Sequence, residues 1–307
     1  SFVTLAEVFA IISAADPALG QIPQNQVGLL NLIASVASPS QKEQLFTSVL
    51  QGWRIGNAGP ERGTKNTLEL KARITADGDD FVINGQKFYS TGALFAHWIA
   101  VKALNHDGKQ VMAFVRRGTP GLRVVDDWSG FGQRTTASGT VLLNNVPVEA
   151  ELVIDNWRLA EVPNIQGAIS QLIQAAIDLG IARGAIADTL SFVRERSRPW
   201  VDAKVERNSD DPYVIADIGK LHIELHAAEA LLRKAGRVLD EVSAAPIDAA
   251  AAARASIAVA EAKALSTELS LLASEKLFEL AGSRATLAEF NLDPHCPNPR
   301  GHPLHDP

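Results

Sequence analysis

The sequence NGQKFYSTG at residues 84–92 lies in a β-rich block, roughly residues 66–150, that stands between two helical regions. It places an aromatic residue, two hydroxyl residues and a glycine, Tyr89 to Gly92, at the end of an expected strand. A flat ligand with polar edges suits such a strand end, because an aromatic side chain can stack on it while hydroxyls donate and accept hydrogen bonds. A polar strand end that simply turns into a loop is the structural alternative.

The β-rich block consists of short expected strands separated by turns. Apolar and polar residues alternate from Leu68 to Ile74, as on a half-buried strand. Turn signals follow at residues 76–79 and 105–108. Further apolar runs lie at residues 81–83, 98–101, 111–115, 122–125 and 140–143. Many short strands with regular turns predict a small antiparallel barrel or sandwich.

Helical spacing dominates the sequence on both sides of this block. Before it, a helix ends at Asp16-Pro17, residues 21–25 read as a polar loop, and Ser38-Pro39 starts another helix. A glycine-rich loop is expected at residues 56–63. After residue 164, the pattern predicts three long helices at residues 165–196, 212–242 and 247–282.

The predicted fold class is therefore α+β. We expect an N-terminal helical domain at residues 1–52, a central β domain at residues 53–155, and a C-terminal helical bundle with a histidine-containing tail at residues 156–307. The chain begins without methionine and already within helical spacing, which predicts that the first domain is incomplete. Small residues such as Gly180 and Gly184 predict close packing in the bundle.

The composition is ordinary for a globular protein, with 46% hydrophobic and 21% charged residues. The 29 basic and 35 acidic residues give a net charge of −6, which argues against nucleic acid as the main partner. The single cysteine, Cys296, excludes an internal disulfide and fits a reducing, cytoplasmic compartment. No apolar run approaches the roughly 18 residues needed to span a bilayer, so no membrane partner is expected.

The end of the chain, HCPNPRGHPLHDP at residues 295–307, contains a more specific motif. With the helix–sheet–helix order and the stretch at residues 84–92, it resembles the acyl-CoA dehydrogenase superfamily. Within that superfamily it is most similar to the flavin-dependent monooxygenase branch, which includes the dibenzothiophene monooxygenases and related sulfur-acquisition oxidoreductases. The residues that match this branch are His302, Leu304, His305, Asp306 and Pro307. Those that depart from it are Cys296, Pro297, Pro299, Gly301 and Pro303. Without the resemblance, the run would read as a disordered polar tail.

The resemblance implies a flavin at the edge of the β domain. Tyr89 would pack on the isoalloxazine ring, Thr91 would hydrogen-bond near its N5 and O4 atoms, and Ser90 would add a donor. Gly92 completes this strand end. Asn57, on the glycine-rich loop, would face the ring edge, because an amide both donates and accepts.

The resemblance also implies a phosphate site made by Arg196, Ser283 and Arg284, with groups from two subunits. The alternative is that Arg196 only offsets the dipole at the C-terminal end of its helix. The dehydrogenases have a glutamine and a Gly-Gly-type segment around the adenosine half of FAD. This chain has DPY at residues 211–213 and AGSR at residues 281–284 instead, which favours FMN and leaves FAD as the alternative.

The function that the resemblance implies is a two-component monooxygenase. A separate NAD(P)H:flavin reductase would supply reduced FMN, and dioxygen would react through a C4a-hydroperoxyflavin with a small organosulfur or similar nucleophilic substrate. His305, His302 and Thr91 would be catalytic, since an imidazole can supply a proton near neutral pH. The expected substrate-lining residues are Gln21, Gln24, Asn25 and Trp128. The alternative for Gln21, Gln24 and Asn25 is a solvated loop, and the alternative for Trp128 is a tryptophan of the core. A homo-oligomer, expected to be a tetramer, follows from the family habit.

Two other functions remain open on the sequence alone. An FAD-dependent acyl-CoA dehydrogenase would need a carboxylate over its substrate, and Glu289 is a candidate outside the expected loop. A truncated, non-catalytic homologue is the second. No metal site is predicted, because Glu224 lies at the wrong offset between His222 and His226 for a His-Glu-x-x-His site.

Overall fold

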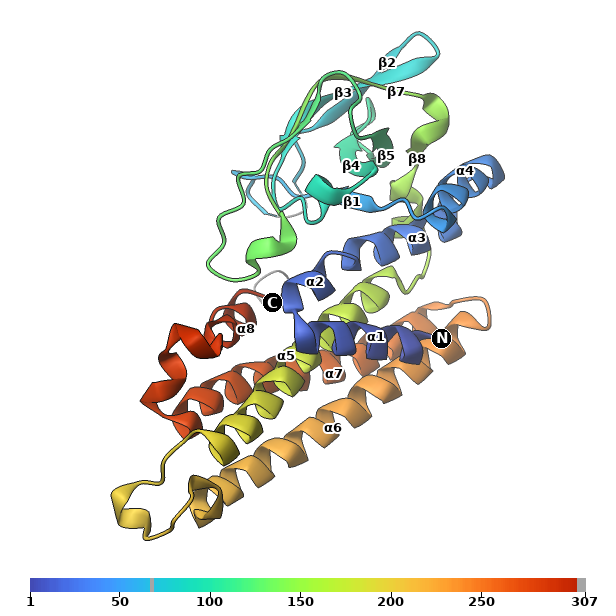
Figure 1. Cartoon of the computed structure of the whole chain (residues 1–307). Helices are drawn as coiled ribbons and strands as arrows, with labels where there is room; N and C mark the ends of the chain where they lie inside the picture. Colours follow the sequence, from blue (N-terminus) through green and yellow to red (C-terminus); the bar gives the residue numbers. More distant parts are fainter. Residues whose placement is uncertain (67–68, 303–307) are drawn as a thin grey trace. The chain divides into compact units, whose positions relative to one another are not determined.

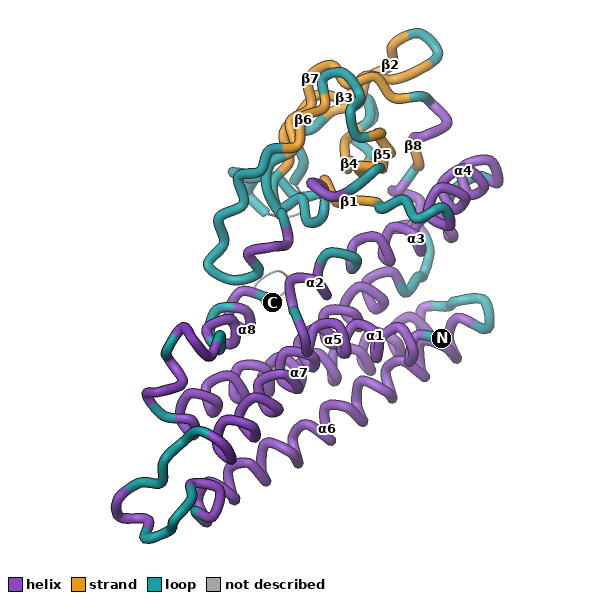
Figure 2. The backbone as a smooth tube through the Cα atoms, in the orientation of Figure 1, coloured by secondary structure: helices purple, strands orange, loops and turns teal. Residues whose placement is uncertain are grey.

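The computed structural model describes residues 1–66 and 69–302, which form two compact units (Figures 1 and 2). The helical unit comprises Ser1–Gly20, Gly130–Gln133 and Gly167–Pro307. The β unit comprises Gln21–Ser129 and Arg134–Gln166. The α+β class, with helices before and after a central sheet in chain order, is confirmed. The division into three domains stays a prediction.

Within the described residues, eight strands form one sheet in the order β6-β7-β3-β2-β4-β5-β8, with β1 paired to β4. The strands are β1 Ile55–Ala58, β2 Arg73–Asp77, β3 Asp80–Lys87, β4 Trp98–Leu104, β5 Gln110–Arg116, β6 Leu122–Val124, β7 Val141–Val148 and β8 Val153–Ile154. Antiparallel pairs dominate, as expected, but β4 pairs in parallel with both β1 and β2.

The α-helices of the described residues include the three long ones that the sequence predicts. They are α1 Phe2–Ala15, α2 Pro17–Gln21, α3 Gln24–Val36, α4 Pro39–Leu50, α5 Gln166–Glu195, α6 Pro212–Ser243, α7 Ala249–Ala281 and α8 Asn298–Gly301. None of these helices combines the length and the apolar content that crossing a bilayer requires. The bounds of α5, α6 and α7 confirm the predicted long helices within two residues at each end.

The β unit has an apolar core to which its helices contribute. Ile33 of α3 and Leu45 of α4 are fully buried in the same cluster as Trp98 of β4. Each such side chain contributes about 1.5–3 kcal/mol when it leaves water. Ser38 and Gln41 form a capping box at the start of α4, which confirms the helix start predicted there.

The helical unit packs α1 closely on α5, as its small residues predict. A Cβ atom added to Gly180 would lie 2.5 Å from the carbonyl oxygen of Ala10, so no larger residue fits without a shift. Arg183 of α5 joins α1 and α6 by ion pairs of 2.8 Å with both Glu7 and Glu229.

Two expectations for the β unit are wrong in part. Gly56 and Asn57 belong to β1 rather than to a loop, because a glycine lets the strand approach Ala93, whose Cα would lie 2.6 Å from an added Cβ. The strand expected from Leu68 begins only at Arg73, and Leu68 itself lies outside the described residues. The backbone N–H groups of residues 71 and 72 donate to the side chain of Glu61 instead of to a neighbouring strand.

The polar loop expected at residues 21–25 is also wrong in part. Gln21 ends α2, whereas Gln24 and Asn25 open α3. A new helix, α2, begins at Pro17 because the Asp16 side chain accepts hydrogen bonds from the N–H groups of residues 18 and 19. Gln21 and Gln24 are buried, with 3% and 6% of their surface exposed, so they are not solvated.

Candidate functional site

The stretch after β3 turns its hydroxyl side chains into the β unit. Tyr89 has a φ of 56°, which is uncommon for a residue with a side chain and costs backbone strain. This turn leaves Tyr89 43% exposed, whereas Ser90 and Thr91 are 0% and 4% exposed. Backbone hydrogen bonds hold the stretch, from Ser90 N to Gly139 O, from Gly92 N to Thr136 O and from Asn57 N to Thr91 O.

A cluster of buried hydroxyls lies next to this stretch. The Oγ1 atom of Thr91 and the Oγ atom of Ser138 are 2.8 Å apart, and Ser138 is equally close to Thr136 Oγ1. The Oγ atom of Ser90 is buried and has no hydrogen-bond partner among the described residues. Buried polar groups are nearly always paired, so the Ser90 hydroxyl is an exception that the described residues do not satisfy.

Aromatic side chains surround the exposed ring of Tyr89. Its ring lies 4.7 Å from that of Phe88 and 6.1 Å from that of Trp128, both in edge-on contacts. The guanidinium carbon of Arg62 is 3.1 Å from the centre of the Phe88 ring. The structure therefore brings Tyr89 and Trp128 together, and Trp128 is only half-buried.

Asn57 lies in β1 and contacts the residues that follow β3. Its Nδ2 atom lies 3.5 Å from the carbonyl oxygen of Tyr89. The segment that follows is held by a buried ion pair of 2.6 Å between Glu61 and Lys87. Lys87 also donates to the carbonyl oxygen of Gly59. Burial lowers the pKa of Lys87.

Residues 21–25 also lie near this strand end. A Cβ atom added to Gly92 would be 3.4 Å from both the side chain and the carbonyl oxygen of Ile22. The neighbouring Gln21, Gln24 and Asn25 therefore belong to the same region of the β unit as Gly92. Their role in lining a substrate pocket stays a prediction.

In the helical unit, Arg196, Ser283 and Arg284 come together. Arg284 Nη1 donates to the carbonyl oxygen of Arg196, and the two guanidinium carbons lie 5.3 and 5.1 Å from the centre of the Phe290 ring. Ser283 begins the short helix that contains Arg284. Within the described residues, neither guanidinium has a carboxylate in ion-pair distance. Two unpaired guanidinium groups on one aromatic ring are suited to a phosphate.

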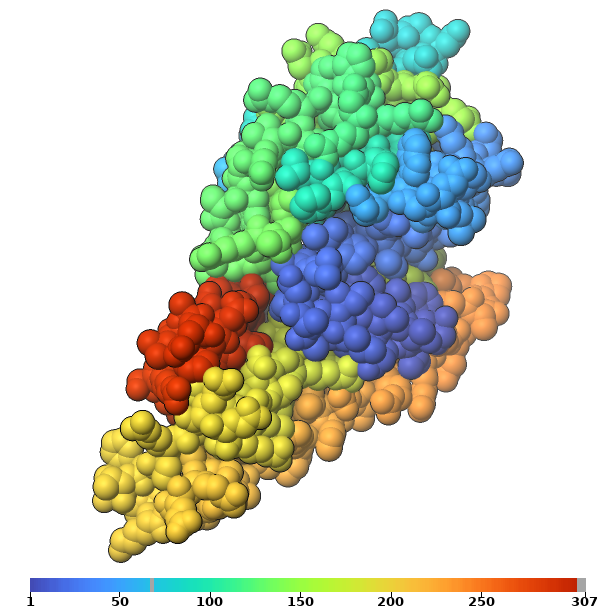
Figure 3. All heavy atoms as spheres, in the orientation of Figure 1, coloured from blue at the N-terminus to red at the C-terminus, as the bar shows by residue number. Residues whose placement is uncertain are grey.

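The C-terminal segment, residues 283–302, is joined to α5 by two histidine–aspartate pairs. His302 Nδ1 lies 2.6 Å from Asp178 Oδ1, and both side chains are buried. His295 Nε2 lies 2.7 Å from Asp188 Oδ2 in a more exposed position. The space-filling view shows this segment in red, packed on the yellow residues that end and follow α5 (Figure 3). His305 lies outside the described residues.

Comparisons with known proteins agree with this arrangement. Residues 58–146 match the family model of the acyl-CoA dehydrogenase middle domain, and residues 172–295 match that of the C-terminal domain. A dibenzothiophene monooxygenase of Rhodococcus erythropolis is 32% identical over 99% of this chain and 76% of its own length. The chain belongs to the flavin-dependent monooxygenase branch of the acyl-CoA dehydrogenase superfamily.

Two further members of this monooxygenase branch are similar along most of their length. A probable FMNH2-dependent monooxygenase, SfnC of Pseudomonas putida, is 32% identical over 91% of this chain and 71% of its own length. The crystal structure of FMN-bound TdsC from Paenibacillus sp. A11-2 has a TM-score of 0.95 and 30% identity, and it covers 100% of this chain and 80% of TdsC.

In this monooxygenase, sequence reasoning missed Thr136, Ser138, Asp178 and Thr267. The run TTASGT at residues 135–140 has a hydroxyl-rich composition that could have drawn attention to the first two. Asp178 is a lone charge in the apolar run AAIDLG at residues 175–180, which is a signal for a buried functional group. Nothing in the sequence near Thr267 distinguishes it.

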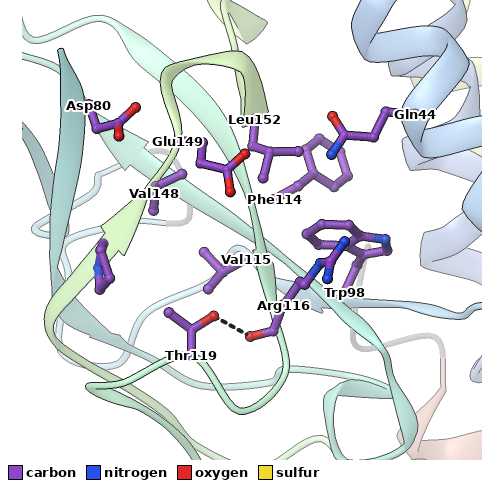
Figure 4. A pocket seen from close by; sticks show the side chains of 11 residues that line it. Gln44, Asp80, Trp98, Phe114, Val115, Arg116, Thr119, Val148, Glu149 and Leu152 are labelled. Atoms are coloured by element: carbon purple, nitrogen blue, oxygen red, sulfur yellow. Dashed lines mark hydrogen bonds between the residues drawn. The ribbon is translucent and has the colours of Figure 1, made fainter.

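The monooxygenase also has a cavity of ≈ 360 Å³ in the β unit (Figure 4). Its lining includes Gln44, Asp80, Trp98, Phe114, Arg116 and Glu149. Figure 4 shows the Arg116 side chain beside Trp98, and the guanidinium carbon is 5.2 Å from the centre of that ring. None of the predicted flavin-binding or substrate-lining residues contributes to this cavity.

Proposed function

We propose that this chain is the oxygenase component of a two-component, FMNH2-dependent monooxygenase that acts on a small organosulfur compound. The near full-length similarity to dibenzothiophene monooxygenase and to SfnC supports the reaction class. A separate NAD(P)H:flavin reductase would supply reduced FMN, and dioxygen would be the co-substrate. A cytoplasmic location, where reduced flavin is produced, is part of the same proposal.

The observation that carries this proposal is the buried, unpartnered hydroxyl of Ser90 beside the Thr91–Ser138 pair. A flavin ring has nitrogen and oxygen atoms at its edge that would accept a hydrogen bond from Ser90 once its side chain, which is fully buried in this structure, turns toward the ring. The hydrogen bond between Thr91 and Ser138 would fix the direction in which the Thr91 hydroxyl faces the flavin. Tyr89 would pack on the ring, and Gly92 and Asn57 would complete the edge of the site.

Arg196, Ser283 and Arg284 would hold the phosphate of FMN. Both guanidinium groups are exposed and free of carboxylates among the described residues, so they would bind a dianion without first breaking an ion pair. In the same proposal the protein is a homotetramer, in which the phosphate of one ring is held by residues of a neighbouring subunit.

Reduced FMN, when bound, supplies the two electrons that activate dioxygen. The residues of this chain bind, orient and shield the reactants. Tyr89 and Trp128 would form apolar walls that accept an aromatic sulfide and exclude water, with Gln21, Gln24 and Asn25 at the polar side. His305 and His302 would hold a proton near the reacting oxygen, because an imidazole exchanges protons near neutral pH.

The test is oxygen transfer by the purified protein. Anaerobically reduced FMN and the protein are mixed with ¹⁸O-labelled dioxygen and dibenzothiophene, and the sulfoxide is analysed by mass spectrometry. We expect one labelled oxygen atom in the product and little free peroxide. Peroxide alone from a well-folded protein that binds FMN would overturn the proposal, and bleaching of bound flavin by an acyl-CoA would establish the dehydrogenase instead. Failure to bind either FMN or FAD would establish a non-catalytic homologue.

Ser90→Ala tests the observation itself. We expect the Kd of reduced FMN to rise about fivefold to tenfold, since one hydrogen bond contributes about 1 kcal/mol. The flavin-free protein should unfold at an unchanged or higher temperature, because the lost hydroxyl has no partner among the described residues. Thr189→Val is the matched control. It removes another buried hydroxyl, which bonds to the carbonyl oxygen of Ala185 within α5, and it should not change the Kd.

A further inference from the structure

We propose that Asp178 is a positioning residue for the monooxygenase reaction. Through His302, which precedes His305 by three residues in the sequence, it anchors the C-terminal segment to α5. This inference rests on the proposed function, in which the tail histidines hold a proton near the reacting oxygen.

The geometry is that of a buried carboxylate with a hydrogen-bond partner on each oxygen. Asp178 is 0% exposed, and its Oδ1 atom is 2.6 Å from His302 Nδ1. Its Oδ2 atom accepts a hydrogen bond of 2.6 Å from Thr267 Oγ1 of α7. The three side chains join α5, α7 and the C-terminal segment within the helical unit.

Filling of the core does not by itself account for a carboxylate at this place. The neighbouring positions of α5 are apolar and buried, and a leucine or alanine would fill such a core at lower cost, since taking a charge out of water is expensive. The carboxylate is useful only through the groups that it binds. One of these, His302, lies in the segment that leads to the second tail histidine.

Asp178 also fixes the imidazole itself. The 2.6 Å contact between Asp178 Oδ1 and His302 Nδ1 restrains the orientation of the imidazole, so the ring cannot rotate freely. The same segment contains a second pair, His295 with Asp188, but the Asp188 side chain is 49% exposed and competes with water. The buried pair is therefore the stronger anchor, and the exposed pair is a matched comparison on the same helix.

Asp178→Asn tests the proposal, with Asp188→Asn as its control. Asparagine has nearly the same shape as aspartate, so the core stays filled. The first measurement is the rate of tryptic cleavage after Arg300, which is exposed and lies within α8, where the backbone is helical while the segment is docked. We expect cleavage about tenfold faster in Asp178→Asn and less than about twofold faster in Asp188→Asn. A spin label on Cys296, the exposed single cysteine, should become mobile in the first variant only.

The second measurement separates positioning from a structural role. The ratio of peroxide to oxygenated product should rise about fivefold to tenfold in Asp178→Asn, with a Kd for reduced FMN within about twofold of wild type. In a His302→Gln background, Asp178→Asn should have no further effect on either measurement, since both residues would act as one unit. If Asp178→Asn does not fold, Thr267→Val, which removes only the second hydrogen bond, should show both effects in weaker form.

Each outcome decides the proposal. Wild-type cleavage rates in Asp178→Asn would overturn the anchor. Faster cleavage with an unchanged product ratio would overturn the positioning role and leave the proposed function intact. A wild-type protein that transfers no oxygen would overturn the proposed function and the positioning role together, while the cleavage rates would still decide whether Asp178 docks the segment.

Discussion

Both units of this monooxygenase bury an acidic side chain against a basic one, but the two pairs differ in how the chain could release them. In the β unit, Glu61 and Lys87 are 3% and 0% exposed, and Lys87 ends β3, which lies between β2 and β7. In the helical unit, Asp178 and His302 are equally buried, but His302 lies at the end of a short helix in the C-terminal segment.

The two pairs differ in how much of the structure must move before the basic side chain can reach solvent. Lys87 cannot reach solvent unless a strand leaves the middle of the sheet, so an unpaired Lys87 has to be tolerated in place or the unit unfolds. His302 can reach solvent when one segment undocks, which leaves the long helices intact. Removing a partner should therefore destabilise the whole β unit in the first case and release one segment in the second.

Glu61→Gln should have the largest effect. It leaves the Lys87 ammonium buried without a carboxylate, which costs about 3–5 kcal/mol of the free energy of unfolding. Lys87→Met is the control, because Glu61 keeps the N–H donors of residues 71 and 72 and the loss should be smaller. Urea unfolding followed by circular dichroism measures both. Equal losses in the two variants would show that burial of the ammonium is not the decisive cost.

The Glu61–Lys87 pair should also determine how steeply the free energy of unfolding falls at low pH. Burial alone would raise the pKa of Glu61, but hydrogen bonds from Lys87 and the N–H groups of residues 72 and 71 outweigh it and hold the pKa below its ordinary value of 4.5. A carboxyl with a lowered pKa contributes stability that is present above about pH 4.5 and is lost as the pH falls through the folded-state pKa. Wild type should lose up to about 1.4 kcal/mol more per pH unit than Glu61→Gln in that window. If the free energy of unfolding fell with the same slope in both proteins over this pH range, Glu61 would not be the group responsible.

The proposed phosphate site consists of exposed side chains, so substitutions there should weaken FMN binding without destabilising the fold. Arg196→Ala or Arg284→Ala should raise the Kd of FMN about tenfold, or about 1.4 kcal/mol, and reduce its salt dependence. The unfolding temperature should not change. Arg198→Ala is the matched control, because Arg198 belongs to the same basic run but makes no contact with Phe290. An equal effect of all three variants would indicate a general charge effect instead of a site.

The smallest effect is expected where an ion pair is exposed. Lys234 of α6 and Glu261 of α7 are 2.7 Å apart, as close as the buried pairs, but 56% and 44% of their side chains are exposed. Lys234→Met should change the free energy of unfolding by less than about 1 kcal/mol, since water already solvates both groups. A loss as large as that of Glu61→Gln would show that burial does not separate these pairs.

Local patterns were sufficient for the regular elements. The three long helices, the capping box of α4 and most strands follow from the spacing of apolar residues and from turn and cap residues within a few positions of each other. The stretch at residues 89–92 stands out by its own composition, but it follows β3, which ends at Lys87, and does not belong to the strand as expected. Such features depend on neighbours in sequence, because helix and strand periods repeat over short distances.

Contacts between distant residues could not be read in the same way. The late start of β2 depends on Glu61, ten or more residues earlier, and the anchor of the tail depends on Asp178, 124 residues from His302. Hydrogen bonds of this kind do not follow the helix or strand period. Even where one partner stands out, as Asp178 does in an apolar run, the sequence does not identify the other partner. The amino-acid order thus predicts which elements form and which chemistry the chain contains, whereas long-range packing selects which hydroxyls and charges are buried and paired, because burial is a property of the folded chain as a whole.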